Sequence, residues 1–126
     1  MKRILYCFVD GTLLTKEMDN ESDYVKGIIK TDSLLRLEEQ GHQVVIVSPS
    51  PYLDKRCRDK HWVKDYSSND QRHLNVKKAM EIHSFTKEQT IYIDDSEELR
   101  KQVKESLQIK TLSPEEFLLE VESIKV

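Results

Sequence analysis

Three short apolar runs limit what this chain can fold into. Residues 3–9, 43–47 and 90–93 are rich in Val, Ile and Tyr, and each runs directly into polar or turn-forming residues. This pattern is typical of buried β-strands. We therefore expect three strands, each ending abruptly at its carboxyl end.

The stretches between these runs have the spacing of helices. Leu residues within 34–37 precede Gly41, a typical C-terminal stop, and the apolar residues within 76–83 recur at steps of three or four. Over 97–107, apolar residues recur every four positions and predict a further helix. Strands that alternate with helices favour an α/β fold with a parallel sheet covered by helices on both faces.

The last third of the chain adds two more elements. Residues 109–112 predict a short strand, and the series Ser-Pro-Glu-Glu over 113–116 combines an N-cap, a proline at the first helical position and an acid at the third. A final helix is expected there. Over 52–75 the pattern is weaker, and indicates a helix at 52–60, a short strand at 62–66 and a loop at 67–71.

Size and composition favour one domain, residues 1–126, because 37% apolar residues supply a single core. With 20 basic and 23 acidic residues the net charge is −3, so charge does not support nucleic acid as a partner. The sequence has no apolar run of about 20 residues and no signal-peptide pattern, so a cytoplasmic protein without a membrane partner is expected. Cys7 and Cys57 have neither disulfide nor metal spacing, and we expect free thiols.

Polar residues follow the three main strands where each one ends. They are Asp-Gly-Thr at 10–12, Ser-Pro-Ser at 48–50 and Asp-Asp-Ser at 94–96. In a parallel sheet these segments share one edge, where ligands bind. Grouped carboxylates need a cation, and hard oxygen ligands beside hydroxyls suit Mg²⁺ and a phosphate group. Lys77 or Lys78 would supply a positive charge to an anionic substrate.

These segments also resemble a known family. The series DGTLL after the first strand, VVIVS ending at Ser48, a lysine before the next strand, and IYIDDS resemble, in order, the four motifs of the haloacid dehalogenase superfamily of phosphatases and related hydrolases. The resemblance implies a three-layer α/β/α, Rossmann-like parallel sheet and hydrolysis through an aspartyl phosphate. The chain has no large insertion between the motifs, which is typical of the branch without a cap domain.

The resemblance assigns roles to individual residues. In the family the first strand ends in Asp-x-Asp-Gly-Thr, where the first aspartate is the nucleophile and the second is the general acid and base. Asp10 matches the second. Binding of the phosphoryl group falls to Ser48, Lys77 (or Lys78), Gly11 and Thr12, and Mg²⁺ binding to Asp94, Asp95 and the backbone carbonyl of Asp10.

Phe8 stands where the nucleophile is expected. Phenylalanine has no lone pair for attack and no charge for a metal, so the covalent route is expected to be closed and Mg²⁺ binding weakened. We also expect its ring at the mouth of the site, in the space meant for phosphate. A shifted alignment would make Asp10 the nucleophile and put Thr12 at the acid position, but the residues on either side match the family without a shift.

Each of these residues also has a purely structural interpretation. Asp10 alone is as well explained by capping a turn, and Ser48 by ending a strand before a proline. Capping of the helix from Glu97 explains at most one of Asp94 and Asp95. Helical lysines are usually only solvated.

Three functional hypotheses follow from this pattern. The first is a catalytically impaired phosphatase-like domain with a binding or regulatory role. Its partner would be a phosphorylated small molecule or macromolecule. The second is an active Mg²⁺-dependent phosphatase lineage in which Phe8 is a variant or engineered residue. The third is a hydrolase in which Asp10 activates water directly. Whether the chain is an enzyme depends on position 8.

Overall fold

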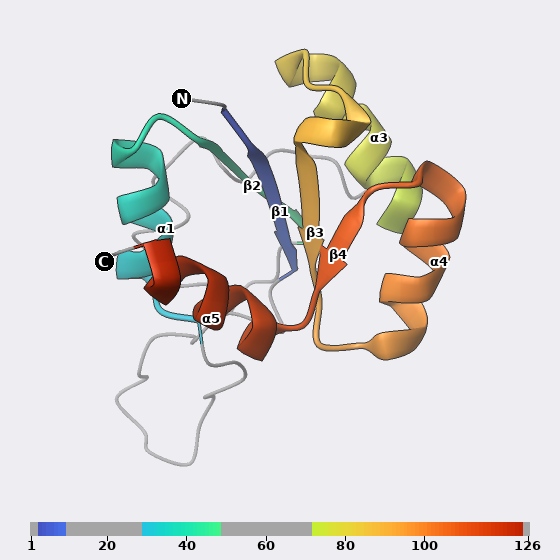
Figure 1. Ribbon diagram of the computed structural model, residues 1–126. Helices are drawn as coiled ribbons and strands as arrows, with labels where there is room; N and C mark the ends of the chain where they lie inside the picture. The colour runs from blue at the N-terminus through green and yellow to red at the C-terminus, as the bar shows by residue number, and fades with distance from the viewer. Residues whose placement is uncertain (1–2, 10–28, 49–71, 125–126) are drawn as a thin grey trace, which may run out of the picture.

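The computed structural model describes residues 3–9, 29–48 and 72–124 (Figure 1). Within them four strands form one parallel sheet in the order β2-β1-β3-β4. The strands are β1 (Leu5–Val9), β2 (Gln43–Ser48), β3 (Thr90–Ile93) and β4 (Lys110–Leu112). All four predicted runs in these ranges are confirmed, with bounds that differ by at most two residues.

Helices precede or follow each strand in the described ranges. They are α1 (Thr31–Glu39), α3 (Arg72–His83), α4 (Glu97–Leu107) and α5 (Pro114–Ile124), with a short 3₁₀ turn, η2 (Lys87–Gln89). Gly41 follows the C-cap of α1 and has a φ of 95°, a backbone conformation that favours glycine. At the start of α5, Ser113 and Glu116 exchange side-chain and backbone hydrogen bonds as the sequence predicts. The helix, strand and loop expected over 52–71 lie outside the described residues.

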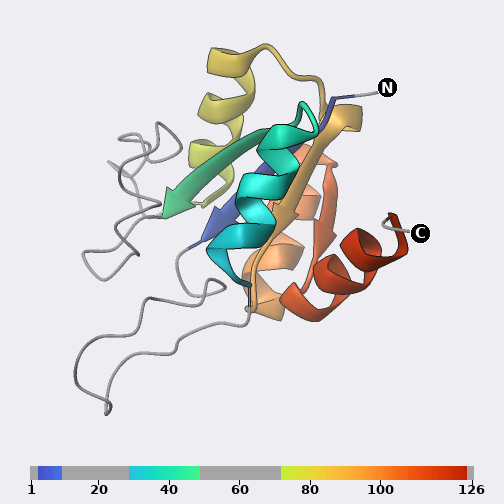
Figure 2. The ribbon, with the colours of Figure 1, turned by 90° about the vertical axis from the view of Figure 1, so that its left-hand side faces the viewer.

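Helices cover both faces of the sheet, with α1 and α5 on one face and α3 and α4 on the other (Figures 1 and 2). Two clusters of buried side chains correspond to these faces. The first joins Tyr6 and Phe8 of β1 to α1 and α5, and the second joins Leu5, Cys7 and Val9 of β1 to α3 and α4. Because alternate residues of β1 enter opposite clusters, the strand is buried on both sides. The fold is therefore α/β with a parallel sheet, compatible with a Rossmann-like fold.

The register of the sheet determines which residues share a face. Phe8 of β1 lies opposite Ile93 of β3, and the pairing of β1 with β2 shifts by one residue after Phe8. Val9 lies opposite Ser48 rather than Val47, so β2 carries a bulge at its carboxyl end.

None of the helices in the described ranges is long and apolar enough to cross a membrane.

Candidate functional site

The strand order indicates where a ligand would bind. From β1 the chain passes to β2 on one side and then to β3 on the other side of β1, so the order reverses between β1 and β3. In open parallel sheets the crevice beyond the carboxyl ends of such strands is the usual binding site. Ser48 ends β2 and Asp94 directly follows β3. Asp10, Gly11 and Thr12 directly follow β1 in sequence but lie outside the described residues.

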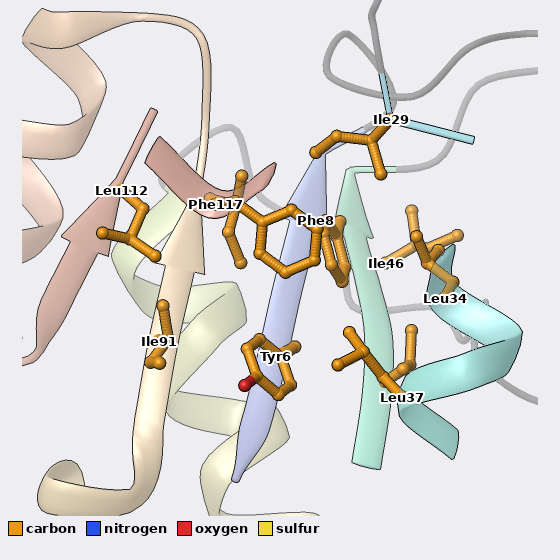
Figure 3. Close-up of a cluster of buried hydrophobic side chains, with 11 residues drawn as sticks. Tyr6, Phe8, Ile29, Leu34, Leu37, Ile46, Ile91, Leu112 and Phe117 are labelled. Atoms are coloured by element: carbon orange, nitrogen blue, oxygen red, sulfur yellow. The ribbon is translucent and has the colours of Figure 1, made fainter. Parts of the chain in front are cut away.

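Phe8 is a core residue at this end of β1. Its side chain is 0% exposed and lies in the cluster between the sheet, α1 and α5 (Figure 3). Its ring meets that of Phe117 edge to face, with centroids 5.3 Å apart and planes at 89°. The expectation that this ring stands at the mouth of the site is wrong, because the ring packs sideways into the core. The position offers neither a nucleophile nor a metal ligand.

Asp94 is buried, and its hydrogen-bonding groups are occupied by other parts of the chain. The Tyr92 hydroxyl donates to Oδ2, and the backbone N–H of Ser96 donates to Oδ1 over 3.0 Å. Its backbone carbonyl accepts from Nη1 of Arg100 over 2.7 Å, and its N–H donates to the carbonyl of Leu112 over 3.2 Å. A side chain with 2% exposure is thereby held in one orientation.

The electrostatics of Asp94 reflect this burial. Desolvation raises the pKa of its carboxyl, and the adjacent Asp95 carboxylate raises it further, while the hydrogen bonds from Tyr92 and Ser96 act in the opposite direction. Asp95 itself is exposed. The pair therefore consists of one fixed, buried carboxyl group and one that faces solvent.

Capping of α4 does not account for the acidic pair. The N-cap is Ser96, whose side chain accepts from the backbone N–H of Leu99 over 3.2 Å. Asp94 supports this cap only indirectly, by accepting the N–H of Ser96. Neither Asp94 nor Asp95 is the N-cap of α4, so the capping interpretation is wrong for both residues. Burial of the Asp94 carboxyl costs free energy, and helix capping does not explain why that cost is met.

Phe8 and Asp94 are not brought together. Ile93, the partner of Phe8 across the sheet, shares its cluster with α1 and α5. Asp94 bonds to Tyr92, which lies in the cluster with α3 and α4. The position predicted for the nucleophile and the predicted metal ligand thus face opposite sides of the sheet.

Helix α3 places different residues at this edge from those that the sequence pattern suggested. Lys77 and Lys78 are exposed in the middle of the helix. Arg72, the first residue of α3, has a buried Nε atom without a hydrogen-bond partner, as far as the structure describes the chain. Its charge acts on the buried Tyr92 phenol, whose pKa is raised chiefly by desolvation. A positive charge at the start of α3 therefore acts on Tyr92, the hydrogen-bond partner of Asp94.

Asn75 ties α3 to the bulge of β2. This amide is 3% exposed, and its Nδ2 donates to the carbonyl of Val47 over 3.2 Å. The register of β1 and β2 shifts beside this carbonyl, and Asn75 supplies it with a hydrogen bond from α3. The bond fixes the backbone directly before Ser48.

The described residues supply part of what a divalent cation needs. No group of three or more His, Cys, Asp and Glu side chains forms among them. Asp94 and Asp95 offer two adjacent carboxylates, and oxygen ligands of this kind suit Mg²⁺, which usually keeps several waters and takes only one or two carboxylates. The acidic pair is compatible with Mg²⁺.

Three residues at this edge were missed by the sequence analysis. Arg72 and Asn75 lie in the first turn of α3, before the apolar repeat of 76–83 that predicts this helix, and Tyr92 lies inside the apolar run that predicts β3. Alternate residues of a strand point to the same face, so Tyr92 is expected on the same side as Asp94. This spacing could have identified Tyr92 as a partner of Asp94 from the sequence.

No protein-family model, curated protein or solved structure matches this chain.

Proposed function

We propose that the chain is a member of the haloacid dehalogenase superfamily, with a three-layer α/β/α domain over residues 1–126 and no cap domain. Support comes from the order of the four motif-like segments in the sequence and from a parallel sheet whose strand order reverses between β1 and β3. Asp94 and Asp95 directly follow β3, which is where the resemblance requires an acidic pair.

The proposed function is binding or regulation by a catalytically impaired phosphatase-like domain. One observation carries this proposal: Phe8, at the nucleophile position, is wholly buried against Phe117 and its neighbours. An aromatic ring integrated into the core has no atom that forms an aspartyl phosphate. Its ligand would be a phosphorylated small molecule or macromolecule, bound in the cytoplasm.

In this proposal Mg²⁺ would be held by Asp95, which faces solvent, with Asp94 and the backbone carbonyl of Asp10. When bound, the ion would neutralise the acidic pair and attract phosphate oxygens. Ser48, Gly11 and Thr12 would contact the phosphate group.

Arg72 is a better candidate than Lys77 for the cation that faces the phosphate. Its guanidinium Nε is buried and has no partner among the described residues, whereas Lys77 is exposed on the outer part of α3. A buried donor without a partner costs free energy, and a phosphate oxygen would relieve that cost.

The second candidate function is an active Mg²⁺-dependent phosphatase lineage in which Phe8 is a substituted residue. The observation that favours it is the burial of the Asp94 carboxylate, with one hydrogen bond to each oxygen, because a buried carboxylate is costly to keep without a use. Such a lineage would still need a nucleophile that the chain lacks at position 8.

Magnesium binding tests the proposed site first. Titration of the ¹⁵N-labelled chain with MgCl₂ is expected to shift the amide resonances of Asp95 and Ser96 in a saturable manner. Asp95→Asn should weaken binding by about tenfold or more, because it removes a charged oxygen ligand. Glu98→Gln, which removes an exposed acid from the first turn of α4, is the matched control and should leave binding within about twofold. Absence of saturable shifts in the unmodified chain would refute the magnesium site.

Turnover separates the two candidate functions. The purified chain is expected to hydrolyse p-nitrophenyl phosphate with Mg²⁺ no faster than its Asp10→Asn variant. Robust hydrolysis that this variant abolishes would refute the impaired-domain proposal and support the active lineage. Robust hydrolysis that it leaves intact would point to a contaminating enzyme, which a second purification step removes.

A further inference from the structure

The interaction between Tyr92 and Asp94 couples a fully buried aromatic residue to the proposed metal site. Tyr92 is 0% exposed, and its ring belongs to the cluster between the sheet, α3 and α4. Its hydroxyl donates to Oδ2 of Asp94, two residues further on and on the same face of the chain. The ring is fixed by packing, so the hydroxyl has a fixed position too.

The two oxygens of Asp94 are held from different directions. Tyr92 reaches Oδ2 from the core, and the N–H of Ser96 reaches Oδ1 from the start of α4. Each carboxylate oxygen accepts more than one bond, so both retain a lone pair for a further ligand. Two donors at fixed positions define the plane of the carboxylate, whereas the Ser96 bond alone leaves it free to rotate about that contact.

We propose that Tyr92 is a positioning residue for the cation site: its hydroxyl sets the plane of the Asp94 carboxylate so that a lone pair faces the cation held beside Asp95. This inference rests on the proposed function, because it assumes that Asp94 and Asp95 take Mg²⁺. Partners that orient metal-binding side chains are known to change metal affinity by about 10- to 100-fold when removed.

The test is a double-mutant cycle on magnesium affinity. Tyr92→Phe removes the hydroxyl and keeps the ring, and should weaken Mg²⁺ binding by about tenfold in the NMR titration. In an Asp94→Asn background the same substitution should change affinity by less than about twofold, since the carboxylate on which Tyr92 acts is gone. Tyr6→Phe, at the buried tyrosine of β1 on the opposite face, is the control and should leave affinity unchanged.

A second measurement needs no metal. In metal-free crystal structures the Asp94 carboxylate should hold one plane in the unmodified chain and a rotated or disordered plane in Tyr92→Phe, with the far-ultraviolet circular dichroism of both unchanged. An unchanged carboxylate plane in Tyr92→Phe, or an equal loss of affinity in both backgrounds, would overturn the proposal. If the unmodified chain itself binds no Mg²⁺, the proposed function is wrong. If it binds and Tyr92→Phe binds equally well, only the role of Tyr92 is wrong.

Discussion

Replacement of Phe8 by aspartate would restore the carboxylate that the family resemblance requires, and the structure predicts that it destabilises the fold. Phe8 is 0% exposed, and its ring centroid lies 5.3 Å from that of Phe117 and 6.5 Å from that of Tyr6. Truncation of a buried Phe costs about 3–5 kcal/mol. An unpaired buried carboxylate adds about as much again. Since domains are stable by only about 5–15 kcal/mol, Phe8→Asp should lose much or all of the free energy of unfolding.

Urea unfolding at pH 7, followed by circular dichroism, measures this loss. Phe8→Ala isolates the cavity, and the further loss in Phe8→Asp measures burial of the charge. Lys77→Asp introduces the same residue at an exposed position of α3 and should change stability by less than about 0.5 kcal/mol. If Phe8→Asp is within about 1 kcal/mol of the unmodified chain, position 8 faces solvent or the site, and the core assignment fails.

Acidification provides an independent check on this reasoning. Burial would raise the pKa of the introduced carboxyl above its unfolded value near 3.9, so the folded chain would bind the proton first as the pH falls. The destabilisation caused by Phe8→Asp relative to Phe8→Ala should therefore shrink between neutral pH and pH 4. A difference that stays constant would show that the carboxylate is solvated. A folded Phe8→Asp chain that hydrolyses phosphate esters would support the active lineage.

Two further predictions concern stability. Asn75→Ala removes the buried amide that donates to the carbonyl of Val47 and should cost about 1–3 kcal/mol in urea unfolding, whereas a loss below about 0.5 kcal/mol would show that the bond contributes little. Nδ1 of His42 accepts the N–H of Ile4 over 3.1 Å, and burial, followed by the charge of Arg3, lowers the pKa of His42. As the pH falls, the unfolded chain therefore protonates His42 before the folded chain does. The contribution of His42 to the free energy of unfolding is complete above about pH 6.5 and decreases as the pH drops from there towards the folded pKa. The urea midpoint should therefore decline more between pH 7.5 and 5.5 in the unmodified chain than in His42→Gln; equal declines would refute this assignment.

The strands and helices of the described ranges were largely predictable because local chemistry determines them. The Val-rich and Ile-rich runs gave β1, β2 and β3, and Ser113 with Glu116 marked the start of α5. The start of α3 was missed because its first turn contains Arg, His and Asn rather than an apolar repeat. Its position depends on tertiary contacts, among them the bond from Asn75 to β2.

The candidate site was less predictable, because it depends on how strands are aligned. Sequence alone placed Asp94 and Asp95 at the end of a strand, which is confirmed. It did not show that Phe8 pairs with Ile93, and hence that Phe8 and Asp94 face opposite sides of the sheet. Side-chain direction along one strand follows a period of two, but the relation between two strands requires their register. Asp10, Gly11, Thr12 and the side chain of Ser48 lie outside what the structure describes, and their roles stay predictions.

The strand order also has a consequence for how the chain folds. β1 lies in the interior of the sheet, and its partner β3 is encoded far along the chain, with Leu5 opposite Thr90. Contacts so distant in sequence slow folding, because the intervening chain must lose entropy before they form. During synthesis the apolar strand Leu5–Val9 emerges long before β3 exists and must remain unpaired on that side. The segment that carries Phe8 is therefore open to aggregation in the nascent chain until β3 has been made.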